Sequence, residues 1–213
     1  MRRIDLETWA RREHFEVFRT FEIPHFNICA NVDLTAFYSF VKKNGISLNI
    51  ATVYVLTRSA NALPEFRYRI RGEEVIEHEI VHPSSTIMGK NDVFSFCTME
   101  YREKFPDFAA RNAEKIARVR ERPRLMEEDQ KRDDLLFMTA IPWVSFTSFM
   151  HPLSLPVDSV PRFAWGKFFE EEESLKMPLS VQAHHALMDG LHMGRYFEVV
   201  QENLQQPESV LSN

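Results

Sequence analysis

The sequence predicts a two-layer α/β sandwich, in which helices cover a mixed, mostly antiparallel sheet. Three observations favour this fold class. Segments with helical spacing interleave with short alternating segments, hydrophobic residues make up 44% of the chain, and only six glycines are present. No Gly- or Ser-rich linker divides the 213 residues, and this length suits one domain. We therefore expect residues 1–213 to form a single domain.

Four segments have the apolar spacing of helices. The first follows Asp33, which can cap a helix, and stops before Gly45, a residue that suits a helix end. The third has a charged outer side and ends before Pro123, which cannot continue a helix. The four segments are Leu34–Val41, Leu48–Leu63, Asp107–Arg122 and Leu191–Gln205.

Four other segments have the pattern of strands. One contains Arg71-Gly72, which predicts a turn between two short strands. The charged segment Arg124–Asp134 is expected to form an exposed loop or a short helix. The strand candidates are Tyr68–Ile76, Phe94–Tyr101, Phe137–Met150 and Leu179–His184.

Composition excludes several classes of protein. Lys and Arg number 26 and Asp and Glu number 31, so the net charge of −5 argues against a nucleic-acid partner. No apolar run reaches about 18 residues, so we expect no membrane span. Cys29 and Cys97 form neither a disulfide framework nor a metal motif, which favours reduced thiols in a cytoplasmic protein. The 18 Phe need burial in a core, a pocket or a subunit interface.

The segment Pro178–Gly190 carries the clearest chemistry. An alternating strand leads into His184 and His185, and Asp189 and Gly190 follow before a helix begins. A neutral His at a strand end, facing a cleft, suits a general base. Asp189 lies too far along the chain to be a direct orienting partner, so we expect it to pin the turn through an arginine.

Two alternatives for these residues stay open. Both histidines can be ordinary turn residues. A zinc site formed by His184, His185, Asp189 and His192 is the other alternative. Neighbouring strand residues point to opposite faces, which argues against one metal bound by His184 and His185, and we predict no metal site.

Other catalytic patterns are absent. The chain has no G-x-S-x-G, no P-loop, no G-x-G-x-x-G and no H-E-x-x-H. The simplest remaining chemistry is a His base that activates the substrate's own nucleophile. Acyl transfer from a thioester to an alcohol fits, and its tetrahedral oxyanion requires a hydrogen-bond donor.

Several ordered motifs resemble those of the chloramphenicol acetyltransferase family, the HHxxxDG coenzyme A-dependent acyltransferases. The resemblance runs along almost the whole chain and implies their acyltransferase-like fold. The short His-His motif is also similar to that of carrier-protein condensation domains, and a variant occurs in the acyltransferase component of 2-oxo-acid dehydrogenase complexes. The motifs that carry the resemblance are Trp9–Phe15, Asn61–Ile70, Pro142–Phe149 and His184–His192.

The resemblance implies a role for each matching residue. His185 is the general base for the acceptor hydroxyl, and a bond to its own backbone carbonyl holds the ring. Asp189 forms a structural salt bridge with Arg11, although Arg12 is an alternative partner. Thr139 stands where the family has a serine that donates to the oxyanion, so the hydroxyl is kept and a methyl group is added.

The substrate contacts are implied in the same way. Ala164 replaces a family threonine that holds an ordered water, which is a departure from the pattern. Lys167 and Phe168 match coenzyme A contacts, or are ordinary strand residues. The acceptor pocket is expected to include the aromatic residues Phe18, Phe94 and Phe149, unless these belong to the core.

The function implied by the resemblance is acetyl transfer from acetyl-CoA to a hydroxyl of chloramphenicol or a similar small acceptor. Acetyl-CoA is then a co-substrate, and no tightly bound cofactor is expected. The resemblance also implies a homotrimer with active sites between subunits. The alternatives are an acetyltransferase for a different hydroxylated acceptor, a catalytically weak relative that binds a small molecule, and a zinc hydrolase.

Overall fold

The computed structural model describes residues 1–125, 132–153 and 156–212, so most of the predicted loop or short helix at Arg124–Asp134 lies outside the described residues. The helices are α1 (Arg12–Phe18), α2 (Thr35–Lys43), α3 (Leu48–Asn61), α4 (Phe105–Glu121), α5 (Gly190–Gln205) and α6 (Pro207–Leu211), with short 3₁₀ turns at Pro64–Arg67 and Lys90–Asp92. The strands are β1 (Arg2–Arg3), β2 (His25–Asp33), β3 (Tyr68–Arg71), β4 (Glu74–Glu77), β5 (His82–Met88), β6 (Phe94–Thr98), β7 (Leu135–Ile141), β8 (Arg162–Gly166), β9 (Phe169–Glu171) and β10 (Ser174–His184).

The main sheet is mixed and mostly antiparallel, as predicted. Its strand order is β2-β10-β8-β7-β5-β6, and β9 pairs with β10 beside this path. The pairs β5–β7 and β7–β8 are parallel, whereas β10 pairs antiparallel with β2, β8 and β9, and β5 with β6. A smaller sheet has the order β1-β4-β3.

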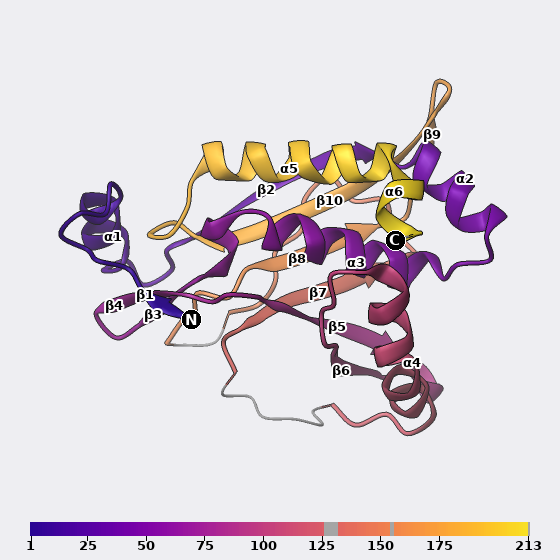
Figure 1. The fold of residues 1–213 in the computed structure, drawn as a ribbon, viewed down its shortest axis with the longest axis horizontal. Helices are drawn as coiled ribbons and strands as arrows, with labels where there is room; N and C mark the ends of the chain where they lie inside the picture. Colours follow the sequence, from indigo (N-terminus) through magenta and orange to yellow (C-terminus); the bar gives the residue numbers. More distant parts are fainter. Residues whose placement is uncertain (126–131, 154–155, 213) are drawn as a thin grey trace.

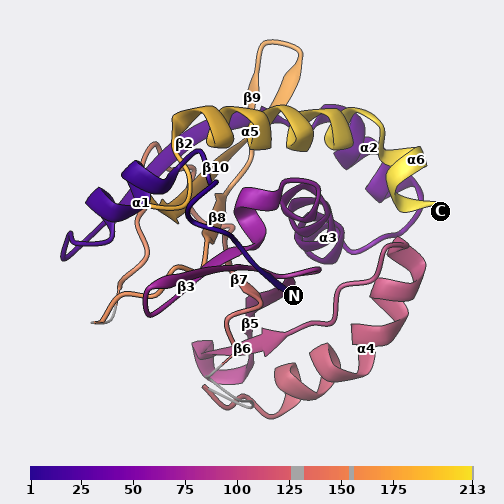
Figure 2. The same ribbon diagram turned by 60° about the vertical axis from the view of Figure 1, so that its left-hand side comes forward.

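Helices α3, α4 and α5 lie on one side of the main sheet, whereas α1 packs with the smaller sheet. Figures 1 and 2 show α5 alongside β2 and β10, α3 over the middle of the sheet, and α4 towards β5 and β6. The core lies between these two layers, where burial of apolar surface supplies most of the stabilisation. Among the buried core residues are Val53, Leu56, Met138, Phe163, Val181 and Val200. No helix of the described residues is long and apolar enough to cross a membrane.

The opposite face of the sheet carries a different set of residues, which the strand register defines. Thr139 of β7 lies level with Ala164 of β8, which lies level with Ser180 of β10. Because residues alternate between faces, these three share the side away from the helices. We call this side the outer face. The Ser180 hydroxyl donates to the Phe149 carbonyl at 3.0 Å, so the segment after β7 crosses part of the outer face.

The helix predictions are confirmed with small shifts of boundary. The inner residues predicted for α4 are buried, as its spacing requires. Helix α2 begins at Thr35, whose N–H donates to the Asp33 carboxylate at 2.9 Å, and Gly45 follows it with a φ of +65°. The predicted turn lies one residue later than expected, because Gly72 and Glu73 connect β3 to β4.

The strand predictions need larger corrections. Strand β7 ends at Ile141 rather than Met150, because Pro142 has no N–H to donate to a ladder. Strand β6 ends at Thr98 rather than Tyr101, and β10 begins at Ser174 rather than Leu179. The sequence pattern did not predict β1, β2, β5, β8 and β9, nor the short helices α1 and α6.

Candidate active site

The turn that follows β10 holds His185 by its backbone. The His185 N–H donates to the carbonyl of Pro24 at 2.8 Å, and its carbonyl accepts a bond from Arg11 Nη2 at 3.2 Å. Ala186 and Leu187 of this turn are buried in a second apolar cluster formed with the N-terminal segment and the small sheet. The N-terminal segment therefore positions the turn that carries His185.

Aromatic packing holds the His185 ring. The ring stacks on Phe18 of α1, with centroids 4.0 Å apart and planes within 2°, and lies 4.7 Å from the ring of Phe26 in β2. Its Nδ1 is buried without a hydrogen-bond partner among the described residues. The expected bond from this ring to its own carbonyl is not seen. The two phenylalanines, rather than that bond, fix the orientation of the imidazole.

Arg11 connects the turn to the start of α5. Its Nη1 forms an ion pair with Asp189, while Arg12 pairs instead with the exposed Glu16 at 2.8 Å. Asp189 also caps α5, because its carboxylate accepts the N–H of Leu191 at 3.0 Å. Burial acts to raise the pKa of Asp189, but the hydrogen bond and charge of Arg11, the nearby His192 and the Leu191 N–H together outweigh it and lower this pKa to about 2.

The remaining histidines of the motif have structural partners. His184 contacts His25, with ring centroids 5.2 Å apart, whereas His185 packs on Phe18, so the two side chains occupy different environments, as predicted. His192 Nδ1 lies 2.9 Å from the Asp189 carboxylate. Within the described residues, no group of three or more His, Cys, Asp or Glu side chains is placed to hold a metal ion.

Thr139 lies far from His185 within one chain. Ser180 is level with Thr139 through Ala164 and precedes His185 by five residues, which corresponds to about 16 Å at about 3.3 Å per residue. The hydroxyls of Thr139 and Thr86 lie 2.8 Å apart on the outer face. One copy of the chain therefore does not bring the predicted base and the predicted oxyanion donor together.

The predicted substrate contacts separate into different places. Lys167 and Phe168 follow β8, and the Phe168 ring lies 5.2 Å from the ring of Tyr38 in α2. Phe149 lies over the outer face, and Phe94 of β6 is exposed on that face at its far edge. Of the three predicted acceptor aromatics, only Phe18 touches His185.

Three histidines, of which His184 is buried and His25 and His151 are half-buried, lie on the outer face at the end of β2 and β10. His25 and His184 are register partners, and His151 donates its N–H to the side-chain oxygen of Gln182 at 2.9 Å. Burial and the charge of Arg162 lower the pKa of His25 and of His151 to about 4. Burial and the proximity of His25 lower the pKa of His184 to about 4.

These low pKa values predict a loss of stability in mild acid. The unfolded chain binds protons at these histidines below a pH of about 6.5, while the folded chain binds them only near pH 4, so stability falls between these values. Each proton contributes a slope of about 1.4 kcal/mol per pH unit. Urea unfolding from pH 7 to pH 4.5 measures this slope. His151→Leu should reduce it by about one proton, and an unchanged slope would contradict the assignment.

Two residues at this site were not singled out from the sequence. They are Phe26, which packs against the His185 ring, and Thr86, whose hydroxyl lies beside that of Thr139. Both lie in strands that the pattern did not predict, and the hydroxyl pair of Thr86 and Thr139 depends on the register of β5 and β7. No local signal marks Thr86, because residues 82–88 include three successive polar residues, Ser84, Ser85 and Thr86, and do not alternate.

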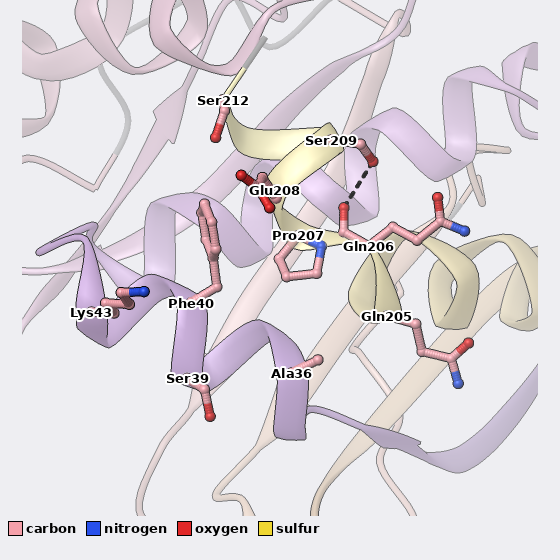
Figure 3. Close-up of a pocket in the computed structure, with 10 residues that line it drawn as sticks. All are labelled: Ala36, Ser39, Phe40, Lys43, Gln205, Gln206, Pro207, Glu208, Ser209 and Ser212. Atoms are coloured by element: carbon pink, nitrogen blue, oxygen red, sulfur yellow. Dashed lines mark hydrogen bonds between the residues drawn. The ribbon is translucent and has the colours of Figure 1, made fainter.

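A separate groove of about 820 Å³ lies between α2 and α6. Figure 3 shows its lining, which includes Phe40, Lys43 and Glu208. It adjoins the last residues of α5, whereas His185 precedes the first, and the 16 residues of this helix span about 24 Å. The groove is therefore remote from the candidate site.

Comparisons with known proteins find relatives that match most of the chain. Residues 1–201 match the family model described as Chloramphenicol acetyltransferase. A chloramphenicol acetyltransferase of Klebsiella sp is 33% identical over 201 residues, covering 93% of this chain and 91% of the relative. One of Clostridium perfringens is 31% identical over 204 residues, covering 93% and 92%.

Solved structures show the same fold. A chloramphenicol acetyltransferase superposes with a TM-score of 0.84 at 27% identity, covering 94% of this chain and 98% of that one. The dihydrolipoamide acetyltransferase of Azotobacter vinelandii superposes with a TM-score of 0.71 at 16% identity, covering 93% and 88%, which is a likeness of fold. The family model and the curated relatives each span most of the sequence. The chain therefore belongs to the chloramphenicol acetyltransferase family.

Proposed function

We propose that the chain transfers an acetyl group from acetyl-CoA to a hydroxyl of chloramphenicol or a similar small acceptor, with His185 as general base. The observation that carries this proposal is the fixed imidazole at the end of β10. Its ring stacks on Phe18 and contacts the tilted ring of Phe26, and its backbone is bonded at both its N–H and its carbonyl. An imidazole held in this way loses little conformational entropy when the acceptor hydroxyl binds beside it.

The proposed reaction uses one imidazole nitrogen of His185 as the proton acceptor. His185 Nε2 accepts the proton of the acceptor hydroxyl while that oxygen attacks the thioester carbonyl carbon. A tetrahedral oxyanion forms, its C–S bond then breaks, and the proton passes from the imidazolium to the departing thiolate. The products are the acetyl ester and free coenzyme A.

Thr139 supplies the donor for the oxyanion. A hydroxyl has one proton, so Thr139 can donate to the oxyanion only when Thr86 donates to Thr139 across the 2.8 Å contact. Thr86 is then a positioning residue for this donor. Ala164, level with Thr139 on the neighbouring strand, provides no hydroxyl beside it.

His185 and Thr139 lie about 16 Å apart along the sheet, beyond the reach of one reacting group, so the proposal requires two copies of the chain. We propose a homotrimer in which His185 of one copy faces the outer face of the next. Exposed apolar side chains on that face or on the segment crossing it support this assembly, because an apolar patch of this kind commonly marks an interface. They include Met88, Phe94, Trp143, Val144 and Met150.

This arrangement also assigns the substrate contacts. Phe94 and Phe149 of one copy and Phe18 of the next then border the acceptor pocket. Lys167 and Phe168 follow β8, the strand beside Thr139, which suits contact with coenzyme A, a phosphate next to the cation and adenine next to the ring. Acetyl-CoA acts as a co-substrate that enters and leaves in each cycle.

A thiol-release assay with acetyl-CoA and a panel of hydroxylated acceptors, chloramphenicol first, tests the proposal. Release that depends on the acceptor supports acetyl transfer, and release with another alcohol but not with chloramphenicol changes only the substrate. A second candidate, a relative that binds a small molecule with little turnover, is favoured by the missing hydroxyl at Ala164. Tight binding of chloramphenicol without thiol release would support that candidate.

Removing the Thr139 hydroxyl should slow turnover. We expect Thr139→Val to lower kcat about 10²–10³-fold with a small change in KM, because the oxyanion loses its donor. Thr139→Ser should keep most of the activity. Thr98→Val is the matched control, since Thr98 donates to Ser84 on the same face but lies on β6. Steady-state kinetics check this, and full activity of Thr139→Val would contradict the assignment.

A further inference from the structure

His192, in the first turn of α5, lies between two carboxylates. Its Nδ1 lies 2.9 Å from Asp189 Oδ1, and its Nε2 lies 3.5 Å from Glu65 Oε1. The His192 side chain is only 11% exposed, so its neighbours rather than water hold the ring. Each ring nitrogen therefore faces a different part of the chain, the start of α5 on one side and the 3₁₀ turn Pro64–Arg67 on the other.

The contact between His192 and Asp189 exists in either tautomer of the ring. Nδ1 lies 3.2 Å from the backbone nitrogen of Asp189 as well as 2.9 Å from its carboxylate. When Nδ1 carries a proton it donates to the carboxylate, and when it carries none it accepts the Asp189 N–H. The ring is therefore bonded to Asp189 in both forms.

The Asp189 carboxylate is held at both oxygens. Oδ1 faces His192 and accepts the Leu191 N–H at 3.0 Å, while Oδ2 pairs with Arg11. Contacts at both oxygens leave the carboxylate little freedom to rotate. Because the Asp189 side chain is 30% exposed, a carboxylate without the His192 ring can turn towards solvent and away from Arg11.

Glu65 holds the opposite side of the His192 ring. The Glu65 side chain is 17% exposed, and no Lys or Arg of the described residues lies within ion-pair distance of it. The neighbouring Arg67 pairs with Glu77 at 2.8 Å instead. Since a mostly buried carboxylate is costly without a polar partner, Glu65 favours the ring position in which Nε2 faces it and Nδ1 faces Asp189.

These contacts lead to the backbone of the proposed base. Arg11 Nη1 pairs with Asp189, and Arg11 Nη2 donates to the His185 carbonyl at 3.2 Å. Only Asp189 and Arg11 therefore separate the His192 ring from that carbonyl. The proposed reaction requires the His185 imidazole within hydrogen-bond reach of the acceptor hydroxyl, so a displaced turn lowers turnover.

We propose that His192 and Glu65 are positioning residues for His185 and act through Asp189 and Arg11. This inference rests on the proposed function, because it assigns both residues to the acetyl-transfer step. Neither side chain contacts the acceptor or coenzyme A in this assignment. Their removal should therefore lower kcat and leave both KM values nearly unchanged.

Three variants of His192 show which contact matters. An asparagine amide can take the place of Nδ1, whereas a glutamine amide reaches further, to the place of Nε2. We expect His192→Leu and His192→Gln to lower kcat about 10-fold, and His192→Asn to keep it within about threefold. Glu65→Leu should lower kcat by a smaller factor, above about twofold. Equal losses in the Asn and Leu variants would overturn a role that acts through Asp189.

His78→Leu is the matched control for a loss of packing. The His78 side chain is also 11% exposed, and its Nε2 lies 3.0 Å from the Asp133 carboxylate. This variant removes an equally buried histidine from a carboxylate that does not contact Arg11. It should lower the melting temperature about as much as His192→Leu does, and it should leave kcat unchanged.

A double variant tests whether His192 acts through Asp189. In the Asp189→Asn background, His192→Leu should lower kcat by less than about a further twofold, because the carboxylate that the ring orients is absent. Two independent roles would multiply the fold-changes of the single variants, and that result would overturn the proposal.

Nuclear magnetic resonance of protein with ¹⁵N-labelled histidine gives a readout that does not need turnover. His185→Ala identifies the imidazole signals of His185 by their loss. We expect His192→Leu and Asp189→Asn to shift these signals, and His78→Leu to leave them in place.

The outcomes separate this proposal from the proposed function. Shifted His185 signals in His192→Leu, together with no thiol release by the wild type from any acceptor, would support the positioning role and refute acetyl transfer. Unchanged His185 signals, or an unchanged kcat, in a folded His192→Leu variant would overturn the positioning role and leave the transferase.

Discussion

His185→Ala is expected to lower kcat/KM for acetyl transfer about 10²–10⁴-fold, the range for loss of a positioned general base. The fold should persist, because the His185 side chain makes no hydrogen bond to the rest of the described chain and its anchoring bonds come from the backbone. The loss should appear in kcat, since the base acts in the transition state. Thiol release under saturating acetyl-CoA measures it.

Two further variants separate chemistry from packing. His185→Gln keeps a polar side chain between Phe18 and Phe26 but cannot take up a proton at neutral pH, so its activity should fall as far. His14→Ala removes an exposed histidine of the same chain and should have no effect. If His185→Ala keeps wild-type turnover while its melting temperature is normal, His185 is not the base.

Asp189→Asn is expected to destabilise the protein by about 1–3 kcal/mol, less than a fully buried pair because the Asp189 side chain is 30% exposed. Asn keeps the cap on α5, so the loss isolates the ion pair with Arg11. Without this pair, Arg11 holds the His185 carbonyl less firmly, and activity should fall about 10–100-fold through misplacement of the base. Urea unfolding and kinetics give the two values.

Arg11→Lys provides a second test of the contacts that Arg11 makes with Asp189 and with the His185 carbonyl. Lys keeps the charge but cannot contact Asp189 and the His185 carbonyl with two nitrogens, so stability and activity should both fall. Arg12→Lys is the matched control, because Arg12 pairs with the exposed Glu16, and this variant should leave the melting temperature unchanged. Since the pKa of Asp189 is lowered to about 2, the stabilisation from this pair is present above about pH 4 and is lost as the pH falls towards 2. Equal melting temperatures and activities of Arg11→Lys and Arg12→Lys would contradict this role of Arg11.

Local patterns predicted the helices well. Helix α4 is an example, because Phe108 and Asn112 recur at helical spacing and are buried, with the Phe108 ring against Tyr54 of α3. The His-His turn was also visible, since its strand, turn and helix lie next to one another in the sequence. In such segments the spacing of a few residues carries the whole signal.

Strands β2 and β5 could not be predicted in this way. Strand β2 includes Asn27 and Asn31, which have low strand propensity, and its nine residues are held by pairing with β10, far away in the sequence. Strand β5 begins at His82-Pro83 and contains two serines, and it is fixed by β6 and β7. Tertiary pairing decided both, and local propensity did not.

The same limit applies to the site. The contact of Thr86 with Thr139 and the cluster of His25, His151 and Gln182 depend on strand register, which no local pattern shows. The likeness in sequence pointed to His185, Asp189, Arg11 and Thr139, but not to Thr86 or to this cluster. The polar residues of β2 and β5 are thus both the reason that the strands were missed and the source of the groups on the outer face.

The central claim is that His185 of one copy and Thr139 of another form one catalytic centre. Its most direct test is a mixed assembly of His185→Ala chains and Thr139→Val chains, co-expressed with different tags and purified through both. Light scattering should give a mass of about 75 kDa, three times the chain mass of 25.1 kDa. A mixed assembly of wild-type chains with the same two tags is the control.

Each variant alone should be nearly inactive. In a mixed trimer, one of the three interfaces joins an intact His185 to an intact Thr139, so thiol release should return to about one third of the control. A mixed trimer of verified composition that stays as inactive as its parents would contradict the claim that the two residues act together across an interface.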